Sequence, residues 1–421
     1  MIDNLAYYGG KRVIKEGEYA VWPSPCEEDL LALKRVVAGE KYHRVNNPIV
    51  IELEEKLKKW SGFTEGRAVN TGTSAIHIGM EYFSQKHNTV IISALNWPSA
   101  VAPIYMAGMK PIYVDVNLED ACLKEDEVLN ALEENSSALV FATHLFGNVS
   151  YLKKVRSYIA DKESLEIFDD CSQGVGISRM FSHSEKTTYT NAIAFSGNGA
   201  KHLASGELGI LLANNKELIE FVDYISLSSS SRNGERVFSP FTKGFNYRPN
   251  VFSCAIAISR LSSLDLQLYI RRKNMLYLYK NIKELKGIRQ LFFPYDDFKN
   301  CYGVPYLIEL NHLGLPEKSV YRDYIVDLLY AEGVPVSVWL KKPVWEYLDY
   351  EKTNCNIENF PNTKKILNTM FYITEIASPN TEDTMRKYTN AIRKVWNFVM
   401  ENTNFIISEV EKKKNGGRQY E

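Results

Sequence analysis

Along the middle of the chain, short runs of apolar residues alternate with longer segments in which apolar residues recur every three or four positions. The apolar runs predict seven strands, at residues 67–70, 88–97, 110–117, 137–147, 165–173, 191–196 and 208–213. The periodic segments predict helices at 47–63, 71–83, 100–109, 126–134 and 151–162. Because the strands alternate with helices and are apolar on both faces, we expect a mostly parallel sheet with flanking helices on both sides.

The pattern changes after residue 260. A long helix at 264–285 leads to strands at 302–311 and 334–340 and to helices at 318–333 and 381–402, which indicates a smaller C-terminal α+β domain. A chain of 421 residues is also too long for one ordinary core. We therefore expect an α/β protein with an N-terminal arm (1–30), a large α/β domain (31–260), a small α+β domain (261–410) and a flexible tail (411–421).

Composition and charge narrow the range of partners. The formal net charge is −1, so no overall field draws the protein to nucleic acid or to an anionic membrane. No apolar run approaches the roughly 20 residues that cross a bilayer, and the N-terminus does not read as a signal peptide. The six cysteines are scattered without a Cys-x-x-Cys pair, which argues against structural zinc and a disulfide framework. We expect a cytoplasmic protein with no metal, nucleic-acid or membrane partner.

Polar and aromatic residues follow several of the predicted strands. In open α/β sheets, ligands bind beyond the carboxyl ends of the strands. The residues found there are the turn Thr71-Gly72-Thr73-Ser74, then Trp97, His144, Asp170 with Gln173 nearby, and Ser196 with Lys201 shortly after. A helix start suited to phosphate, a flat ring, a carboxylate, a hydroxyl and a lysine fit one cofactor, pyridoxal 5′-phosphate (PLP).

Each of these residues has a role in PLP chemistry. Lys201 would form the Schiff base, because a partly desolvated lysine has a depressed pKa, and it could then shuttle the substrate's proton. Asp170 would face the pyridine nitrogen and keep it protonated, so that the ring acts as an electron sink. The remaining roles are phosphate binding by the backbone N–H groups of Thr73 and Ser74 and by the Ser196 hydroxyl, ring stacking by Trp97, and a hydrogen bond from Gln173 to the phenolic oxygen.

Each residue also has an ordinary structural interpretation. A lone lysine is usually solvated, an aspartate that ends a strand can cap a turn, and a tryptophan can belong to the core. Gly-Thr-Ser before a helix is often only an N-cap. His144 is either a packed histidine or a residue of the site wall. The cofactor site is favoured because five such signals follow the strands in the right chain order.

Four stretches, "NTGTSAIHIG", "IFDDCSQGVG", "AFSGNGAKHLASGELG" and "GFNYRPNVFSCAIA", resemble in this order four motifs of the DegT/DnrJ/EryC1/StrS aminotransferases. The opening "LAYYGGKRV…WPSP" and the aromatic stretch "ALNWPSA" resemble the branch with the inosose aminotransferases and 3-amino-5-hydroxybenzoate synthase. The resemblance spans nearly the whole chain. It implies a fold-type I PLP enzyme that acts on keto-sugars or keto-cyclitols, as a homodimer with its sites at the interface.

The resemblance supports the roles given above and adds two residues. Asn246 would reach the phosphate of the neighbouring subunit's cofactor, and Arg232 would contact the amino donor. Two departures concern the substrate pocket and leave the cofactor residues in place. Leu208 stands where the family usually has the third residue of Gly-Glu-Gly-Gly, and the stretch before Lys201 lacks the customary Gly-Asp and the phenylalanine that usually follows Ser196.

The expected function is transfer of an amino group from glutamate or glutamine to a keto-sugar or keto-cyclitol, for a secondary metabolite or a surface glycan. Three alternatives are weighed against it. Sugar 3-dehydratases of this family have histidine where Lys201 stands, so this alternative is discounted. An aromatising dehydratase similar to 3-amino-5-hydroxybenzoate synthase would keep the lysine. A PLP-binding regulator without turnover would want a DNA-binding appendage, and the sequence shows neither a basic patch nor a helix-turn-helix.

Overall fold

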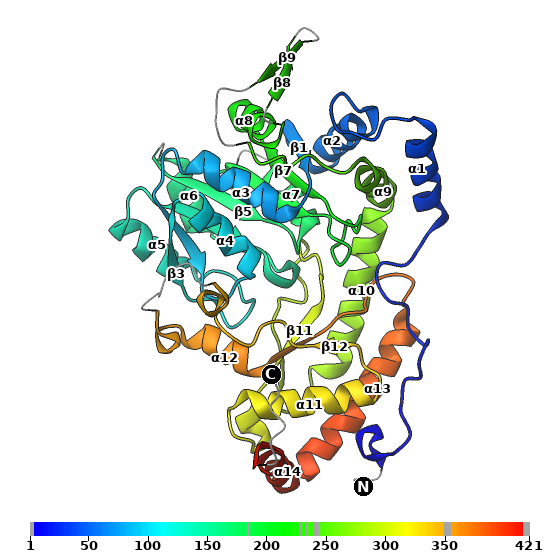
Figure 1. The fold of residues 1–421 in the computed structure, drawn as a ribbon. Helices are drawn as coiled ribbons and strands as arrows, with labels where there is room; N and C mark the ends of the chain where they lie inside the picture. The colour runs from blue at the N-terminus through cyan, green and yellow to red at the C-terminus, as the bar shows by residue number, and fades with distance from the viewer. Residues whose placement is uncertain are drawn as a thin grey trace.

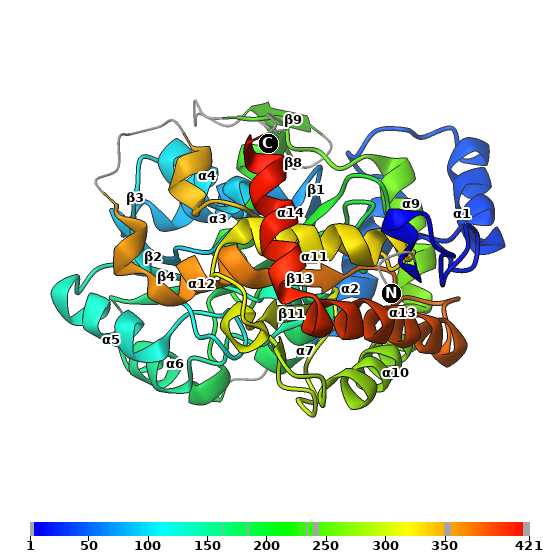
Figure 2. The same cartoon turned by 90° about the horizontal axis from the view of Figure 1, so that it is seen from below.

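The computed structural model describes residues 4–162, 164–182, 185–227, 229–232, 235–238, 244–348 and 355–415 (Figure 1 and Figure 2). Two sheets organise these residues, one of seven strands and one of four, and a two-stranded hairpin stands apart from both. In Figure 1 the long helix α10 (Leu264–Ile282) runs from the region of the large sheet to the region of the small one.

The seven-stranded sheet lies between residues 65 and 213. Its strands are β1 (Glu65–Val69), β2 (Thr89–Ser93), β3 (Lys110–Val114), β4 (Leu139–Thr143), β5 (Glu166–Asp170), β6 (Ala192–Ser196) and β7 (Gly209–Ala213), in the order β1-β7-β6-β5-β4-β2-β3. Strands β3, β2, β4, β5 and β6 pair in parallel, which confirms the expected mostly parallel sheet. Strand β7 pairs antiparallel with both β6 and β1, because the connection at 197–208 is short and contains no helix.

Both faces of the inner strands of this sheet are buried, which explains their long apolar runs. On one face Val90, Phe141 and Phe168 share a core cluster, and on the other Ile91 and Val140 share a second. Neighbouring residues of one strand therefore enter different cores. The surrounding helices are α2 (Pro48–Ser61), α3 (Gly72–Phe83), α4 (Pro98–Met106), α5 (Glu125–Glu134), α6 (Lys153–Ala160), α7 (Ser178–Phe181), α8 (Lys216–Leu227) and α9 (Val251–Ser262).

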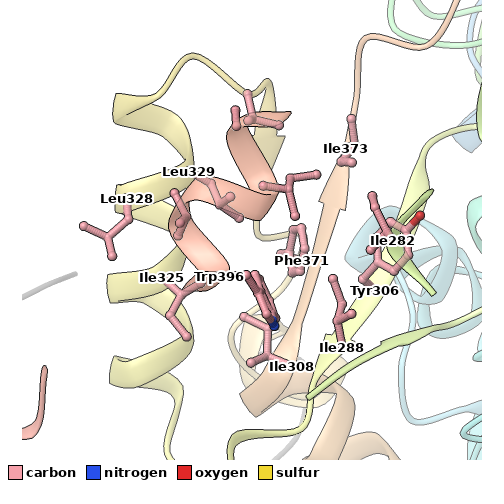
Figure 3. Close-up of a cluster of buried hydrophobic side chains, with 14 of the residues drawn as sticks. Ile282, Ile288, Tyr306, Ile308, Ile325, Leu328, Leu329, Phe371, Ile373 and Trp396 are labelled. Atoms are coloured by element: carbon pink, nitrogen blue, oxygen red, sulfur yellow. The ribbon is translucent and has the colours of Figure 1, made fainter. Parts of the chain in front are cut away.

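The C-terminal part is built on an antiparallel sheet. Its strands are β10 (Ile288–Gln290), β11 (Val304–Ile308), β12 (Val336–Ser337) and β13 (Met370–Ile373), in the order β10-β11-β13-β12. The helices beside it are α11 (Ser319–Ala331), α12 (Pro361–Thr369), α13 (Glu382–Glu401) and α14 (Thr403–Asn415). Figure 3 shows Trp396 of α13 in the core beside Ile308 and Phe371, and its indole N–H donates to the carbonyl of Lys286 at 2.8 Å.

Three features of this part were not expected from the sequence. Strands β10 and β13 and helix α12 are too short to show a clear period. Strand β12 has only two residues, where an apolar run at 334–340 predicted a longer strand. Helix α14 continues to Asn415, into the stretch expected to be a flexible tail, and residues 416–421 lie outside the described residues.

The N-terminal arm lies along the C-terminal part before it reaches the large sheet. The Glu332 carboxylate, at the end of α11, accepts hydrogen bonds from the backbone N–H groups of Ala6 at 2.8 Å and Val13 at 3.1 Å. Farther along the arm, the N–H of Ala20 donates to the Asn380 side chain at 2.8 Å. The arm ends in helix α1 (Glu27–Ala38), which lies beside α9 in Figure 1.

The hairpin of β8 (Ser229–Arg232) and β9 (Glu235–Phe238) projects from the top of the molecule in Figure 1. Within the described ranges, no single helix is long and apolar enough to cross a bilayer. Helices α9 and α10, which meet at a bend of 62°, pass that test only when they are taken together.

Candidate active site

A cavity of about 470 Å³ lies where strands β4, β5 and β6 end, between the large sheet and the C-terminal part. The structure brings six of the residues singled out in the sequence to its wall: Thr73, Trp97, Asp170, Gln173, Ser196 and Lys201. The volume is in the range of small-molecule sites. The carboxyl ends of parallel strands are where an open α/β sheet binds ligands, so the cavity lies at the expected place.

The start of helix α3 forms one end of the cavity. Thr71 caps this helix, since its hydroxyl oxygen accepts the N–H of Ser74 at 3.0 Å, and it shares a second hydrogen bond with the Ser74 hydroxyl at 2.9 Å. Ser74 is buried and pairs with Thr71, whereas Thr71, Gly72 and Thr73 line the cavity. A Cβ on Gly72 would lie 2.7 Å from that of Ser196, so glycine is required for the helix to start this close to β6. The N–H groups and dipole of a helix start suit an anionic group such as phosphate.

Lys201 lies in the loop 197–208, here called the lysine loop, which connects β6 to β7 and is fixed at its base. The N–H of Ser205 donates to the Gly197 carbonyl, and that of Gly199 to the Gly206 carbonyl, both at 2.9 Å. Gly206 has a φ of +91°, a left-handed conformation that glycine adopts without strain. Burial lowers the pKa of Lys201, and the negative charge of Asp170 only partly opposes this. The environment therefore favours the neutral amine, which is the nucleophilic form.

Two neighbouring aspartates at the end of β5 face opposite sides of the sheet. Asp169 is fully buried and its two carboxylate oxygens meet the Arg156 guanidinium at 2.7 and 3.0 Å. Burial alone would raise the pKa of Asp169, but Arg156 and the hydrogen bond from His144 hold it well below its usual range. Asp170 lines the cavity, and burial raises its pKa against the hydrogen bonds from Ser172. Asp169 is thus a structural ion and Asp170 is the carboxylate available to a ligand.

His144 belongs to the buried group around Asp169 and does not line the cavity. Its Nε2 lies 3.0 Å from an Asp169 oxygen, and its Nδ1 accepts the N–H of Ser150 at 3.0 Å. Since Nδ1 accepts, the ring carries its proton on Nε2 and donates it to Asp169. Of the two interpretations of His144, the geometry favours the packed histidine. The backbone N–H of His144 donates to the carbonyl of Asp170 at 3.1 Å.

Trp97 reaches the cavity from the start of α4 and meets a second indole there. The rings of Trp97 and Trp339 are 6.0 Å apart and 28° from parallel, and both line the cavity. About half of the Trp97 surface is exposed, so it is not a core residue. Gln173 is held by its side-chain oxygen, which accepts the N–H of Phe146 at 2.6 Å, so its amide N–H groups are left to act as donors.

The sequence analysis missed the residues that the C-terminal part contributes. These are Tyr302, Ser337, Val338, Trp339 and Tyr372. The ring centroid of Tyr302 lies 4.7 Å from the Lys201 Nζ, and burial raises the pKa of Tyr302 to about 12. Trp22 of the N-terminal arm was also missed, and its indole N–H donates to the Lys201 carbonyl at 2.9 Å. Trp22 lies in the stretch "WPSP" that carries part of the family resemblance, but no role had been assigned to it, and the five C-terminal residues belong to none of the motifs singled out in the sequence.

Asn246 does not line the cavity of this chain. Asn246 is exposed, with a φ of 55°, and follows Phe245, whose ring stacks on that of Tyr247 at 5.4 Å. Arg232 ends β8 in the projecting hairpin, and its side chain lies outside the described residues. Among the described residues, no group of three or more His, Cys, Asp or Glu side chains could hold a metal ion.

The two sequence departures are packed against each other. Leu208 is fully buried in the core beneath the lysine loop. A Cβ on Gly197, the position after Ser196, would lie 2.9 Å from the Leu208 Cβ and 2.8 Å from the Ser205 hydroxyl. A large residue at 197 and Leu208 therefore exclude each other, and this loop places its bulk at 208 instead of 197. The departures alter packing behind Lys201 and leave the cavity-lining polar groups in place.

Comparisons with known proteins agree with this geometry. The family model described as "DegT/DnrJ/EryC1/StrS aminotransferase family" matches residues 24–390. A UDP-4-amino-4,6-dideoxy-N-acetyl-beta-L-altrosamine transaminase of Campylobacter jejuni is 24% identical over 333 residues, which cover 78% of this chain and 84% of that protein. An L-glutamine:2-deoxy-scyllo-inosose aminotransferase of Streptomyces paromomycinus is 24% identical over 295 residues, which cover 66% and 68%.

Among solved structures, that of a 3-amino-5-hydroxybenzoic acid synthase superposes with a TM-score of 0.80 at 17% identity, over 90% of this chain and 99% of that one. At this identity the likeness concerns the fold. It confirms the expected fold-type I architecture.

Proposed function

Because this chain belongs to the DegT/DnrJ/EryC1/StrS aminotransferase family, we propose that it is a PLP-dependent aminotransferase of keto-sugars or keto-cyclitols, with glutamate or glutamine as the amino donor. One observation carries the proposal. A single cavity gathers the Lys201 amine, the Asp170 carboxylate, the Trp97 ring and the start of α3, which come from separate elements.

The residues of the cavity fit PLP as a set. The start of α3 and the Ser196 hydroxyl supply donors for a phosphate, and the required glycine at 72 brings them together. Trp97 supplies a flat face for the ring, and Gln173 supplies amide donors for its phenolic oxygen. Asp170 would meet the ring nitrogen, and a positive charge there would favour the ionised form of this buried carboxylate. The Ser74 N–H and hydroxyl both pair with the Thr71 hydroxyl, so Ser74 would act by orienting Thr71 at the cavity wall.

When bound, PLP supplies an aldehyde that condenses with amines and a ring that accepts electrons from the adjacent carbon. Lys201 would hold the cofactor covalently at rest. Once an amino donor has taken the place of Lys201 on the cofactor, the free Nζ would take the proton from the donor's α-carbon and deliver it to the aldehyde-derived carbon of the cofactor. With the acceptor, Nζ would move a proton in the opposite direction. The lowered pKa of Lys201 suits this exchange, because the amine must both accept and release a proton near neutral pH.

We propose further that two copies of the chain complete two sites. Asn246 is exposed and held by its neighbours, since the Tyr247 carbonyl accepts the Asn70 N–H at 3.0 Å and the Tyr247 hydroxyl contacts His77 at 3.0 Å. The Asn246 side chain is therefore exposed on a segment that is held next to the start of α3, where the phosphate would bind. Arg232 would serve the amino donor from the projecting hairpin.

The activity is tested with purified protein, PLP and a panel of donors and acceptors. We expect a visible absorption band that disappears on reduction, is lost when glutamate or glutamine is added, and returns with the right keto-cyclitol or keto-sugar. Lys201→Ala should lack the band, whereas Lys216→Ala, at an exposed lysine of α8, should keep it. A colourless protein that PLP does not change would refute the proposal. An aromatic product would instead favour the dehydratase, and failure with every donor would favour the regulator.

The shared site is tested with mixed dimers. Lys201→Ala and Asn246→Ala subunits are each weak or inactive alone. If Asn246 serves the partner's site, a mixed dimer contains one fully intact site, so re-associated equal mixtures should recover about a quarter of the wild-type activity. If Asn246 serves its own site, or the protein is a monomer in sedimentation, mixing recovers nothing.

A further inference from the structure

The Lys201 amine is docked on an aromatic face. Its Nζ lies 4.7 Å from the centroid of the Tyr302 ring, and both residues line the same cavity. Tyr302 precedes β11 in the C-terminal part, far along the chain from the lysine loop. The face of an aromatic ring attracts a cation, and the attraction is stronger where water is excluded.

The fold fixes Tyr302 independently of the lysine. Its N–H donates to the Phe146 carbonyl at 3.2 Å, and its carbonyl accepts the fully buried Arg271 guanidinium at 3.2 Å. The ring also packs on the His202 imidazole, with 6.0 Å between the ring centres. The position of the ring is thus set by the large sheet, by α10 and by the lysine loop together.

The backbone of Lys201 is fixed as well, while its side chain has room to turn. The Trp22 indole N–H binds its carbonyl at 2.9 Å, and its own N–H binds the Asn198 carbonyl at 2.8 Å. A flexible side chain on a fixed backbone samples many rotamers unless a contact selects one. The Tyr302 face is such a contact.

We propose that Tyr302 is a positioning residue for Lys201: the face of its ring receives the lysine ammonium that forms when the free amine has taken up a proton, and keeps it at the cavity wall within reach of its next proton transfer. The inference rests on the proposed role of Lys201 in PLP chemistry. Tyr302 acts only through the lysine, and the ring face carries the role, not the hydroxyl.

The charged and titratable groups around this pair are few among the described residues. Asp170 faces Lys201 from β5, and Glu207 lines the cavity from the lysine loop and binds Asn198. Tyr372, Glu375 and the Arg271 guanidinium act on Tyr302 from the C-terminal side, and the imidazole of His202 lies beside both members of the pair. Burial favours the neutral amine of Lys201, whereas Asp170 and the ring face both favour the ammonium.

The test compares two replacements of Tyr302 in the cofactor-free protein. Tyr302→Phe keeps the ring face, and Tyr302→Leu keeps the apolar bulk but removes the face. Acetic anhydride labels neutral amines, so the labelling of Lys201 against pH, followed by mass spectrometry of its peptide, reports the pKa of Lys201. We expect Tyr302→Leu to lower this pKa by about one unit, a tenfold change in protonation, and Tyr302→Phe to leave it within about 0.3 units.

A matched control is Tyr372→Leu, because the Tyr372 ring lines the same cavity but packs on Phe146, with 5.5 Å between ring centres. It should leave the pKa of Lys201 unchanged. In the PLP-loaded protein, Tyr302→Leu should slow the exchange of the donor's α-hydrogen with solvent about tenfold, and Tyr302→Phe should not.

The inference is overturned if Tyr302→Leu labels like the wild type, or if Tyr302→Phe shifts the pKa as far as Tyr302→Leu does. Circular dichroism checks folding, and Tyr302→Met replaces Tyr302→Leu in the same comparison if the leucine variant does not fold. If Tyr302→Leu shifts the pKa of Lys201 but the protein never binds PLP, the proposed function is refuted and the role of the Tyr302 ring stands. If the protein binds PLP but the pKa does not shift, the role of the ring is refuted and the proposed function stands.

Discussion

The two walls of the cavity carry different kinds of side chain. The wall from the seven-stranded sheet carries groups that donate, accept or ionise, such as Lys201, Asp170 and Ser196, each at or just beyond the end of a strand. The wall from the C-terminal part is mostly aromatic, with Tyr302, Trp339 and Tyr372. In the proposed function the first wall would bind and react with the cofactor, and the second would shape the space beside it.

This difference also separates two kinds of constraint. The position of a residue at a strand end is fixed by the pairing of the strands, so the register of one sheet places several polar groups together. Tyr302 inherits its position from a carbonyl of Phe146 and a guanidinium of Arg271, which belong to other parts of the chain. Substitutions in the first wall should therefore change chemistry, and those in the second should change affinity or positioning.

The largest effect is expected at the first wall. Lys201→Ala should lower kcat more than a thousandfold, because it removes both the nucleophile and the proton carrier. Its thermal unfolding should be close to that of the wild type, since burial lowers the pKa of this amine and no structural ion pair is lost. Steady-state kinetics and calorimetry check the two statements, and a variant with a tenth of the wild-type kcat would contradict the assignment.

The adjacent aspartates should separate chemistry from stability within one strand. Asp169→Asn leaves the fully buried Arg156 without its charge partner, and we expect it to lower the free energy of unfolding by about 3–5 kcal/mol. Asp170→Asn should change stability by less than about 1 kcal/mol but lower kcat about a hundredfold. Denaturant titration and kinetics on the same two proteins test the contrast, and equal effects in both would show that the two carboxylates do not face different sides.

The second wall should respond in binding. Trp339→Ala removes the ring that packs on Trp97, and we expect KM for the acceptor to rise about tenfold with kcat changed less than threefold. Trp339→Phe keeps a flat ring and should stay near the wild-type KM. A fall in kcat at constant KM would place Trp339 with the reacting groups of the first wall.

The fourth expected effect is a pH dependence of stability at His202, which is buried next to Lys201. Burial lowers the pKa of His202 to about 3, with Arg271 adding to the effect, whereas the unfolded chain protonates this histidine near 6.5. The unfolded state alone gains the proton as pH falls below 6.5, so the free energy of unfolding should fall by about 1.4 kcal/mol per unit, or about 2 kcal/mol by pH 5.

His202→Asn should flatten this slope, and His312→Asn, at an exposed histidine, should not. Asp170, whose pKa is raised by burial, acts in the opposite direction at lower pH, but it is present in every variant and cancels in the comparison. Urea titrations of the cofactor-free protein at pH 5, 5.7, 6.5 and 7 give the slopes. Parallel slopes for the wild type and His202→Asn would contradict the prediction.

The same contrast decides how much the sequence could predict. The five inner strands of the large sheet, β2, β4, β5, β6 and β7, were visible because both of their faces are buried, whereas the edge strands β1 and β3 are partly exposed and were placed by their shorter apolar runs. Thr73, Trp97, Asp170 and Lys201 could be grouped because strand ends in a parallel sheet converge. Their roles toward PLP remain predictions, as does the partner role of Asn246.

What could not be predicted depends on contacts between distant segments. Trp339 follows a strand of two residues, and Trp22 lies in an arm without regular structure, so neither has a periodic context. The antiparallel direction of β7 depends on the length of the lysine loop, which no apolar pattern encodes. His144 had two interpretations because a strand end can face either the cavity or the helix side, and only the Arg156–Asp169 pair decides between them.

The route of the N-terminal arm has a consequence for how the protein is made. Residues 4–22 leave the ribosome long before the groups that hold them, on Glu332, Glu375 and Asn380, which lie 326 to 360 positions later in the chain. Domains of a nascent chain tend to form in order of synthesis. Here Trp22, which binds the Lys201 carbonyl, is itself held by Glu375, 353 positions later, so a translation product that stops before residue 375 would leave the loop that carries Lys201 without this support, although the large sheet could already have formed.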